Sequence, residues 1–280
     1  MICADIHNHT VASHGLATVG EMFAAALARN LVWYGFSEHS PLPPGYSCPL
    51  YKGDLAVTFP AYADEVLALR EQTSSKKSGA QAQPRVLLGM ELDWLPVNTP
   101  WMCDMVSRYA FDYIIGGLHF VDDVPVGSPR SWGPEVERQE RVVRYNAYYE
   151  AMRGLAASGM VDVVAHPDFI KVCCFDDFQA WLALPDSTDR IAAVLEAMRT
   201  TDTAMEVSSA GLRKPFHEPY PGPAIMRLAA DMGLCISFGS DAHNVEDTGS
   251  HFKELAAYAA SFGFTRCRIC VGRESRELPF

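Results

Sequence analysis

Near the start of the chain, two histidines and an aspartate are spaced so that they could bind a metal ion. Asp5, His7 and His9 stand at positions i, i+2 and i+4, and in an extended strand such side chains point to one face. Two imidazoles beside a carboxylate can hold a divalent metal with nitrogen and oxygen ligands. The apolar residues 1–4 predict a buried strand that leads into this motif. A single motif of this length is also typical of a polar turn at a strand end.

The same arrangement recurs along the chain, because short apolar segments are repeatedly followed by a histidine or an acid. The segments predict strands at residues 31–36, 86–90, 113–118, 161–165, 204–207, 235–239 and 267–271. The polar residues that follow the opening strand and the later ones are His7, His9, His39, Glu91, His119, His166, Asp241 and His243. So many strand-end histidines and acids are not expected by chance, and they indicate one shared site.

Helical patterns separate the predicted strands. Helices are expected at residues 22–29, 60–72, 134–157, 175–199, 223–232 and 252–260. Thr18 and Glu21 fit a capping box before the first helix, and Pro185 predicts a break in the fourth. About seven strand–helix units predict an α/β fold, either a parallel barrel or a doubly wound sheet. The barrel is favoured because its strand ends converge on one mouth, whereas the edges of an open sheet lie far apart.

Composition limits the classes of protein that the chain could represent. It has 280 residues, of which 49% are hydrophobic, and a formal net charge of −11. That charge disfavours nucleic-acid binding, and no apolar run is long enough to span a membrane. We see no signal peptide. The eight cysteines favour reduced core residues, including the Cys267–Cys270 CxxC, which we interpret as structural. These features predict a cytoplasmic protein.

Six short motifs, taken together, resemble the polymerase and histidinol phosphatase (PHP) superfamily. In chain order they are Asp-Ile-His-Asn-His-Thr, Ser-Glu-His-Ser, Gly-Met-Glu, Gly-Leu-His-Phe, Ala-His-Pro-Asp and Gly-Ser-Asp-Ala-His. They extend from Asp5 to His243, which is nearly the whole chain. The resemblance implies a distorted (β/α)7 barrel with a metal cluster at the C-terminal mouth of the strands. We therefore expect residues 1–280 to form a single PHP-type barrel domain.

The resemblance also implies which residues hold the metals. By the family pattern, one metal is bound by His7, His9, Glu91 and Asp241. Glu91 bridges to a second metal, which His119 and His166 complete. A third is held by His14, His39 and His243. Imidazole and carboxylate ligands suit Zn, Mn or Fe, so two or three divalent ions of these kinds are expected.

Such a cluster predicts the hydrolysis of a phosphomonoester by a metal-bound hydroxide. Arg213 is the candidate clamp for the phosphoryl oxygens, because a guanidinium binds them bidentately. Lys171 and Arg130 are candidate second phosphate contacts, and Asp241 or a metal-bound water is the candidate proton donor to the leaving alcohol.

Further carboxylates could support this site. Asp5, Glu38 or Asp93 could orient a histidine from behind, while Glu206, at the end of its strand, could face the substrate.

Within the superfamily, two loops are most similar to the monofunctional histidinol-phosphate phosphatases. They are Ser209-Ala-Gly-Leu-Arg-Lys and His166-Pro-Asp-Phe-Ile-Lys. This similarity implies a small phosphorylated substrate, L-histidinol phosphate, and a role in histidine biosynthesis. The alternatives are a nucleotide phosphatase, phosphodiesterase or nuclease on the same barrel, and a non-catalytic metal-binding regulatory barrel. A metal-dependent amidohydrolase is less favoured, because such enzymes use an activating lysine or another order of ligands.

Overall fold

The computed structural model describes residues 1–48, 50–75, 83–122 and 124–280. Seven parallel strands form one sheet in the order β1-β2-β3-β4-β7-β8-β9. They are β1 (Ala4–Asp5), β2 (Trp33–Phe36), β3 (Arg85–Asp93), β4 (Tyr113–Gly117), β7 (Val163–Val164), β8 (Ala204–Ser208) and β9 (Ile236–Gly239). The last strand approaches the first, since Ile6 N donates to Phe238 O at 3.3 Å. The sheet therefore curls into a nearly closed barrel, and the predicted distorted (β/α)7 fold is confirmed.

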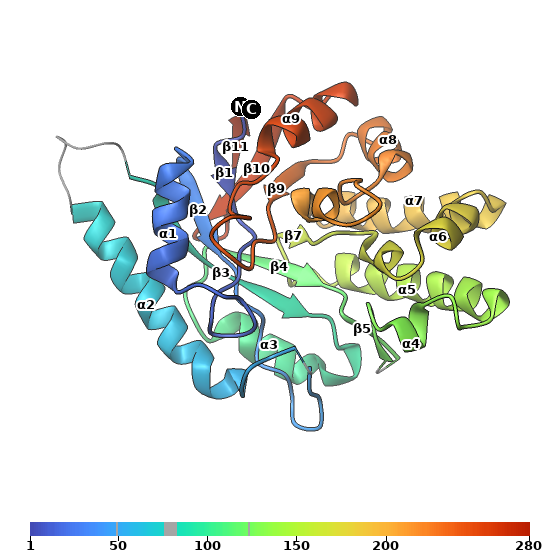
Figure 1. The fold of residues 1–280 in the computed structure, drawn as a ribbon, viewed down its shortest axis with the longest axis horizontal. Helices are drawn as coiled ribbons and strands as arrows, with labels where there is room; N and C mark the ends of the chain where they lie inside the picture. Colours follow the sequence, from blue (N-terminus) through green and yellow to red (C-terminus); the bar gives the residue numbers. More distant parts are fainter. Residues whose placement is uncertain (49, 76–82, 123) are drawn as a thin grey trace.

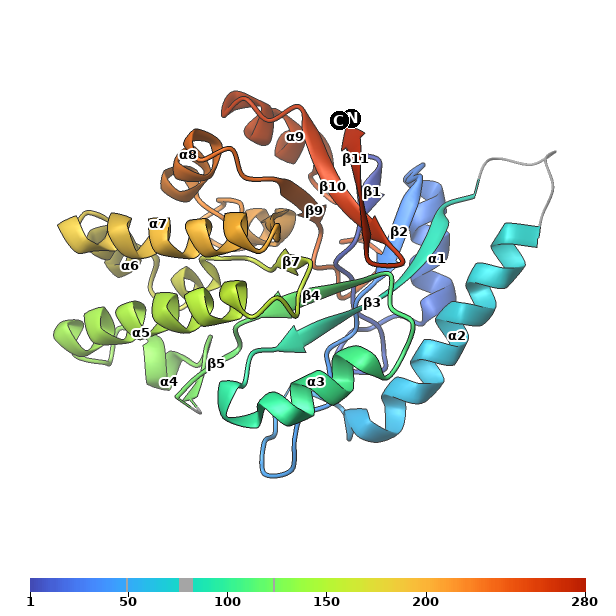
Figure 2. The same cartoon turned by 180° about the vertical axis from the view of Figure 1, so that it is seen from behind.

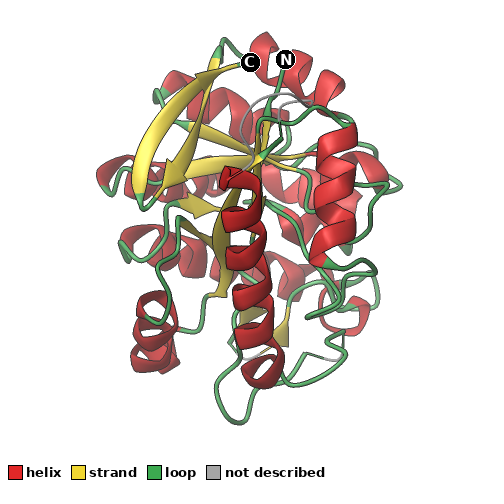
Figure 3. Cartoon of the chain, turned by 90° about the vertical axis from the view of Figure 1, so that its left-hand side faces the viewer, coloured by secondary structure: helices red, strands yellow, loops and turns green. Residues whose placement is uncertain are grey.

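Helices cover the outside of the barrel (Figures 1 and 3). The longer ones are α1 (Val19–Ala28), α2 (Leu55–Ser75), α3 (Thr99–Ser107), α5 (Arg138–Ala157), α6 (Phe175–Leu182), α7 (Pro185–Thr200), α8 (Pro223–Asp231) and α9 (Phe252–Ser261). Short turns of helix are α4 (Pro129–Trp132), η1 (Pro96–Asn98), η2 (Phe169–Val172) and η3 (Ser209–Arg213). The predicted capping box is present, with Thr18 N donating to Glu21 Oε2 at 2.8 Å. No described helix combines the length and the hydropathy that crossing a lipid bilayer requires.

Several elements differ from the sequence prediction. Helix α2 begins five residues before Pro60, which lies inside it, whereas the prediction began at that proline. Helix α3, the hairpin of β5 (Phe120–Val121) and β6 (Val124–Pro125), and strand β11 (Glu274–Pro279) were not predicted. Strand β11 is mostly exposed and polar, so it has no hydrophobic alternation to reveal it. The polar segment 73–84, predicted as a surface excursion, continues α2 to Ser75, and residues 76–82 lie outside the described part.

Strand β3 shows how the barrel positions its polar groups. Leu88, Met90 and Leu92 belong to the core beneath the helices, whereas Leu87 belongs to the barrel interior. Because side chains alternate along a strand, Glu91 shares the interior face with Leu87. Position 89 has to be glycine, since a Cβ there would lie 2.3 Å from Cζ of Tyr113. The Tyr113 side chain is fully buried and belongs to the same interior cluster as Leu87.

The end of the barrel opposite the strand C-termini is closed by an antiparallel hairpin of β10 (Arg266–Val271) and β11. Ile269 and Cys270 from β10 belong to the interior cluster, and Ser237 of β9 donates to Arg268 O at 2.7 Å. Figure 2 shows the hairpin in front of the barrel strands. The cysteines of the CxxC motif are therefore buried in the core, in agreement with their interpretation as structural residues.

Candidate metal centre

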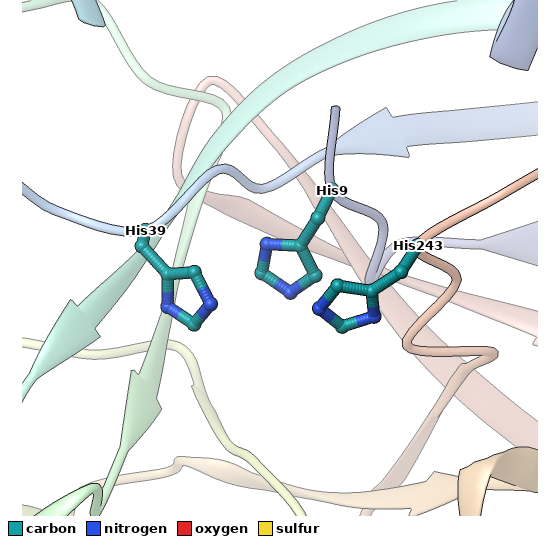
Figure 4. Close-up of side chains that lie close together, drawn as sticks. All are labelled: His9, His39 and His243. Atoms are coloured by element: carbon teal, nitrogen blue, oxygen red, sulfur yellow. The ribbon is translucent and has the colours of Figure 1, made fainter. Parts of the chain in front are cut away.

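All nine side chains predicted to bind metals come together at the C-terminal ends of the strands. Their ligand atoms form overlapping groups within 4.8 Å: one of His9, His39 and His243, one of His7, His9 and Glu91, and one of His39, Glu91 and His119. His166 Nε2 lies 3.2 Å from Glu91 Oε1, and Asp241 Oδ1 lies 3.4 Å from His9 Nε2. The centre of the His14 ring lies 4.2 Å from the centre of the His243 ring. Figure 4 shows His9, His39 and His243 close together around a common space. The open sheet, considered as an alternative, would not bring them together.

Glu91 is the centre of this cluster, and its two carboxylate oxygens face different histidines. Oε2 lies 3.3 Å from His7 Nε2, 3.4 Å from His9 Nε2 and 3.0 Å from His39 Nδ1. Oε1 lies 3.2 Å from His166 Nε2 and 3.5 Å from His119 Nε2. A carboxylate placed in this way can bridge two metal ions.

Three of the histidines are oriented from behind by carboxylates. His7 Nδ1 lies 2.7 Å from Glu206 Oε1, and His9 Nδ1 lies 3.2 Å from Glu38 Oε1. His119 Nδ1 lies 2.7 Å from Asp93 Oδ1. An ionised carboxylate only accepts hydrogen bonds, so it places the imidazole proton on Nδ1 and leaves the lone pair of Nε2 directed at the cluster.

Two of the supporting acids behave differently from the sequence prediction. Asp5 orients no histidine: its carboxylate accepts hydrogen bonds from Ser240 N at 2.9 Å and Gly249 N at 2.9 Å. Glu206 does not face a substrate, because it is fully buried and contacts His7. The sequence signal for Glu206 was available, since it is the one charged residue in the apolar segment 204–207.

Electrostatics divide the histidines into two kinds. Burial alone would lower the pKa of His9, but the neighbouring carboxylates of Asp241 and Glu38 raise it to about 9. Burial is likewise outweighed at His119, where the charges of Glu91 and Asp93 raise the pKa to about 9. The same charges act in return on the acids, so the pKa of Glu91 is held well below its usual value despite burial.

His14 and His243 are neutral histidines at neutral pH. Burial, together with the charges of His243 and His9, lowers the pKa of His14 to about 3. Burial and the charge of His9 lower the pKa of His243 to about 4. A neutral imidazole is the form that binds a metal, so these two side chains are already in the ligating state.

Several ligand atoms of the cluster are buried without a hydrogen-bond partner among the described residues. They are His7 Nε2, His9 Nε2, His39 Nδ1, His243 Nε2 and Glu91 Oε2. Buried polar atoms without a partner are costly and call for an explanation. Because these orphaned atoms converge from several strands and are all metal-ligand types, the residues present fit divalent metal ions.

Two of the three residues predicted to contact phosphate, Lys171 and Arg130, are poorly placed for that role. Lys171 is fully buried, and Nζ donates to Asp168 Oδ2 at 2.8 Å, Glu218 Oε1 at 2.7 Å and Pro219 O at 2.8 Å. These three bonds use every donor of an ammonium, which argues against Lys171 as a phosphate contact. Arg130 is exposed on α4, and within the described part of the chain it makes no contact with the histidine cluster.

Arg213 lies near the cluster, and its Nη1 and Nη2 groups donate hydrogen bonds within the protein. Nη2 donates to Ser240 O at 2.9 Å and to Asp241 O at 3.0 Å. Nη1 contacts Ser250 Oγ at 3.2 Å, and Nε lies 3.4 Å from Asp247 Oδ2. The guanidinium therefore holds the loop that carries Asp241. The phosphate-clamp role of Arg213 stays a prediction.

A parallel barrel with a histidine and carboxylate cluster at the C-terminal ends of its strands defines a metal-binding barrel protein. The PHP domain family model matches residues 5–210. This match covers more than half of the chain, so the chain belongs to the PHP domain family.

Similar proteins share the length of the chain. A relative from Deinococcus radiodurans, described as a probable histidinol-phosphatase, is 29% identical over 251 residues, covering 89% of this chain and 90% of the relative. A relative from Schizosaccharomyces pombe with the same description is 21% identical over 287 residues, which cover 97% of this chain and 90% of the relative. The crystal structure of histidinol phosphate phosphatase from Lactococcus lactis, complexed with zinc, L-histidinol and phosphate, has a TM-score of 0.74 at 17% identity, with 98% of each chain covered.

Proposed function

We propose that the protein is a metal-dependent phosphomonoesterase that hydrolyses L-histidinol phosphate to L-histidinol and phosphate. The observation that carries the proposal is the convergence of nine candidate metal-ligand side chains, with Glu91 at the centre. The substrate assignment is supported by the descriptions of the Deinococcus and Schizosaccharomyces relatives, and by the ligands of the Lactococcus structure. Residues 1–280 would act together as one barrel domain.

The proposed cofactors are two or three divalent ions of zinc, manganese or iron. His7, His9, Glu91 and Asp241 would hold the first, and Glu91 would bridge to a second held by His119 and His166. His14, His39 and His243 would hold a third. Bound ions would neutralise the phosphoryl oxygens and lower the pKa of a water molecule towards 7.

Asp241 is the proposed proton-transfer group. Its carboxylate is partly exposed, at 17%, and lies 3.4 Å from His9 Nε2. Burial opposes its ionisation, but the neighbouring His9 imidazole and the charge of His7 hold the pKa of Asp241 well below its usual value. An ionised carboxylate cannot donate first. Asp241 would therefore accept a proton from the attacking water and then pass it to the leaving alkoxide.

Phosphate release by the purified protein, reconstituted with zinc or manganese, tests this proposal. We expect kcat/KM for L-histidinol phosphate to exceed the values for nucleotides, a phosphotyrosine peptide and a phosphodiester by about a hundredfold or more. Asp241→Asn should lose most of the activity, whereas Asp231→Asn, a matched change at an exposed residue that ends α8, should not.

Two results would contradict the proposal. Comparable turnover of nucleotides or diesters would retain the phosphoesterase and exclude the substrate. An absence of hydrolysis by protein that demonstrably binds metal would indicate a regulatory barrel.

A further inference from the structure

His14 is a candidate ligand that a carboxylate supports only indirectly. Its ring belongs to the loop of residues 11–16, which follows β1, and is partly exposed. The Nδ1 atom of His14 lies 3.4 Å from Oγ of Ser13, the residue before it. The Ser13 hydroxyl in turn donates a hydrogen bond to Glu38 Oε1. Ser13 and Glu38 are both fully buried, so water does not compete for the contact between them.

The order of these contacts determines where the protons lie. An ionised carboxylate can only accept hydrogen bonds, so the single hydroxyl proton of Ser13 is directed at Glu38. The Ser13 oxygen then offers only lone pairs to His14, and it accepts the proton of Nδ1. The Nε2 lone pair of His14 is thereby left to bind a metal, as it is in the histidines that contact a carboxylate directly.

Glu38 supports two candidate metal sites at once. Oε1 lies 3.2 Å from His9 Nδ1 and also accepts a hydrogen bond from His39 N at 3.2 Å. Oε2 accepts two hydrogen bonds from Thr10, from N at 2.9 Å and from Oγ1 at 2.7 Å. His9 is a candidate ligand of the first ion, whereas His14 and His39 are candidate ligands of the third. One buried carboxylate therefore contacts the ligands of both sites.

The loop that carries His14 is held in place by its backbone. Lys52 N donates to Ser13 O at 3.1 Å, and Leu16 N donates to His243 O at 2.7 Å. Neither hydrogen bond involves the Ser13 side chain. Removal of the Ser13 hydroxyl would therefore leave the path of the chain unchanged and affect how the His14 ring is oriented.

We propose that the Ser13 hydroxyl is a positioning group that extends the orienting effect of Glu38 from His9 to His14, and thereby determines whether the centre retains its third ion. The inference rests on the proposed three-ion centre, but it is independent of the proposed reaction. Alanine at position 13 would break the link to His14 and leave the contact between Glu38 and His9 in place. The three ions should therefore be affected unequally.

The experiment compares Ser13→Ala with Ser107→Ala, a matched change at an exposed serine that ends α3 and donates to Asp104 O at 3.0 Å. Zinc per chain is measured by mass spectrometry after dialysis against increasing chelator. Electron paramagnetic resonance of the manganese form reports the pair of ions that Glu91 would bridge, because bridged ions are magnetically coupled. We expect Ser13→Ala to lose one ion at about tenfold lower chelator than the parent and to keep the coupled signal. Ser107→Ala should match the parent in both measurements.

Glu38→Gln should give a broader loss. The neutral amide would orient both His9 and His14 less strongly, so we expect this variant to lose the coupled pair as well as the third ion. The variant also serves as the test should Ser13→Ala fail to fold. Loss of the coupled signal with parental retention of the third ion would then contradict the inference.

Three further results would overturn it. Parental retention of every ion by Ser13→Ala would mean that the hydroxyl does not orient His14. Loss of all the ions together would indicate a general structural role for Ser13. A parent protein that never binds more than two ions would remove the third site itself. That last outcome leaves the proposed reaction untouched, because phosphate release tests the reaction separately.

Discussion

The acids behind the histidines decide which nitrogen of each ring faces the centre. Glu206, Glu38 and Asp93 each contact an Nδ1 atom and lie buried. Without such a partner, an imidazole can rotate or adopt the other tautomer, and its Nε2 lone pair is lost to the metal. The binding strength of the centre should therefore depend on residues that do not touch a metal.

Glu206→Gln tests this dependence. The amide is nearly the same size but is neutral, so it orients His7 less strongly, and we expect metal affinity to fall by about 10- to 100-fold. Isothermal titration with zinc measures the change. Glu196→Gln, at an exposed position of α7, is the matched control and should bind zinc as the parent does. Equal affinity in both variants would show that the Glu206 contact is structural only.

The raised pKa values of His9 and His119 predict how zinc binding depends on pH. Both are about 9 without metal, so both rings are protonated at pH 7 and must lose their protons to ligate. We expect at least two protons to be released per protein at pH 7, and the affinity to rise as the pH approaches 9. Titration in two buffers with different ionisation enthalpies counts the protons, and a count near zero would contradict the raised pKa values.

The stability of the metal-free protein should fall as the pH rises, whereas the affinity for zinc should rise. His9 and His119 have a higher pKa in the folded protein than the 6.5 of the unfolded chain. The stability that they contribute is therefore complete below pH 6.5 and is lost as the pH rises through about 9. His14 and His243, with pKa values of about 3 and 4, contribute fully throughout that window. The Tm of metal-free protein should therefore fall between pH 6.5 and 9, as calorimetry would show; a constant Tm would contradict this expectation.

The positions of the candidate ligands were easier to predict from the sequence than the residues that each ligand contacts. A histidine after an apolar segment can be located, because a strand end is a defined place in a barrel. Glu206 stands out as the one charged residue of its segment, but its contact with His7 could not be predicted, since it depends on which atoms from distant segments lie within about 3 Å of one another. His7 and Glu206 are separated by 199 positions, and sequence spacing carries no information on such a pair.

At the scale of elements, β3 shows how a strand positions a central ligand of the site. Along its interior face, the side chains change from apolar to acidic. Leu87, Gly89 and Glu91 follow one another on that face, with the Tyr113 ring against the glycine. The missing side chain at position 89 makes room for the ring.

Gly89→Ala should accordingly destabilise the fold. The added Cβ would lie 2.3 Å from Cζ of Tyr113, and overpacking of this kind costs about 1–3 kcal/mol. Urea denaturation measures the loss. Gly20→Ala is the control, because a Cβ there has no atom within 4 Å and alanine favours helix α1 by up to about 1 kcal/mol. Equal stability of the two variants would mean that the Tyr113 ring can move aside.

Most elements with a buried face were predictable within a few residues at their ends, and helix α3, with its buried Met102 and Met105, is an exception. The barrel strands and most of the helices that cover them are apolar on at least one side, which is the signal that a sequence carries. The exposed strand β11 and the short hairpin of β5 and β6 pair through their backbones, and backbone pairing leaves no hydrophobic pattern. The organisation of residues 1–280 as one domain stays a prediction.

At the scale of the whole molecule, the two ends of the barrel have separate tasks. The hairpin of β10 and β11 inserts Ile269 and Cys270 into the interior at one end, while the candidate metal centre occupies the other. Barrels commonly separate stability and chemistry in this way. A change in the hairpin should therefore affect unfolding without affecting the site.

Ile269→Ala provides the test. The side chain is 1% exposed, and its truncation should cost about 2–5 kcal/mol of unfolding free energy. Zinc affinity, measured well below the Tm of the variant, should stay within about twofold of the parent. Val97→Ala, at a side chain that is 78% exposed, should change neither quantity. A loss of zinc affinity in Ile269→Ala would show that the two ends are coupled.

The seam between β1 and β9 has a consequence for how the protein is made. His7 and His9 leave the ribosome early, while Asp241 and His243 come from the last barrel strand, so synthesis separates them by on the order of ten seconds or more. Parallel pairing of such distant segments is itself slow. During that interval the early histidines are exposed, on a chain whose centre is incomplete. Correct metal loading should therefore be a late event, governed by which ions are present when the barrel closes.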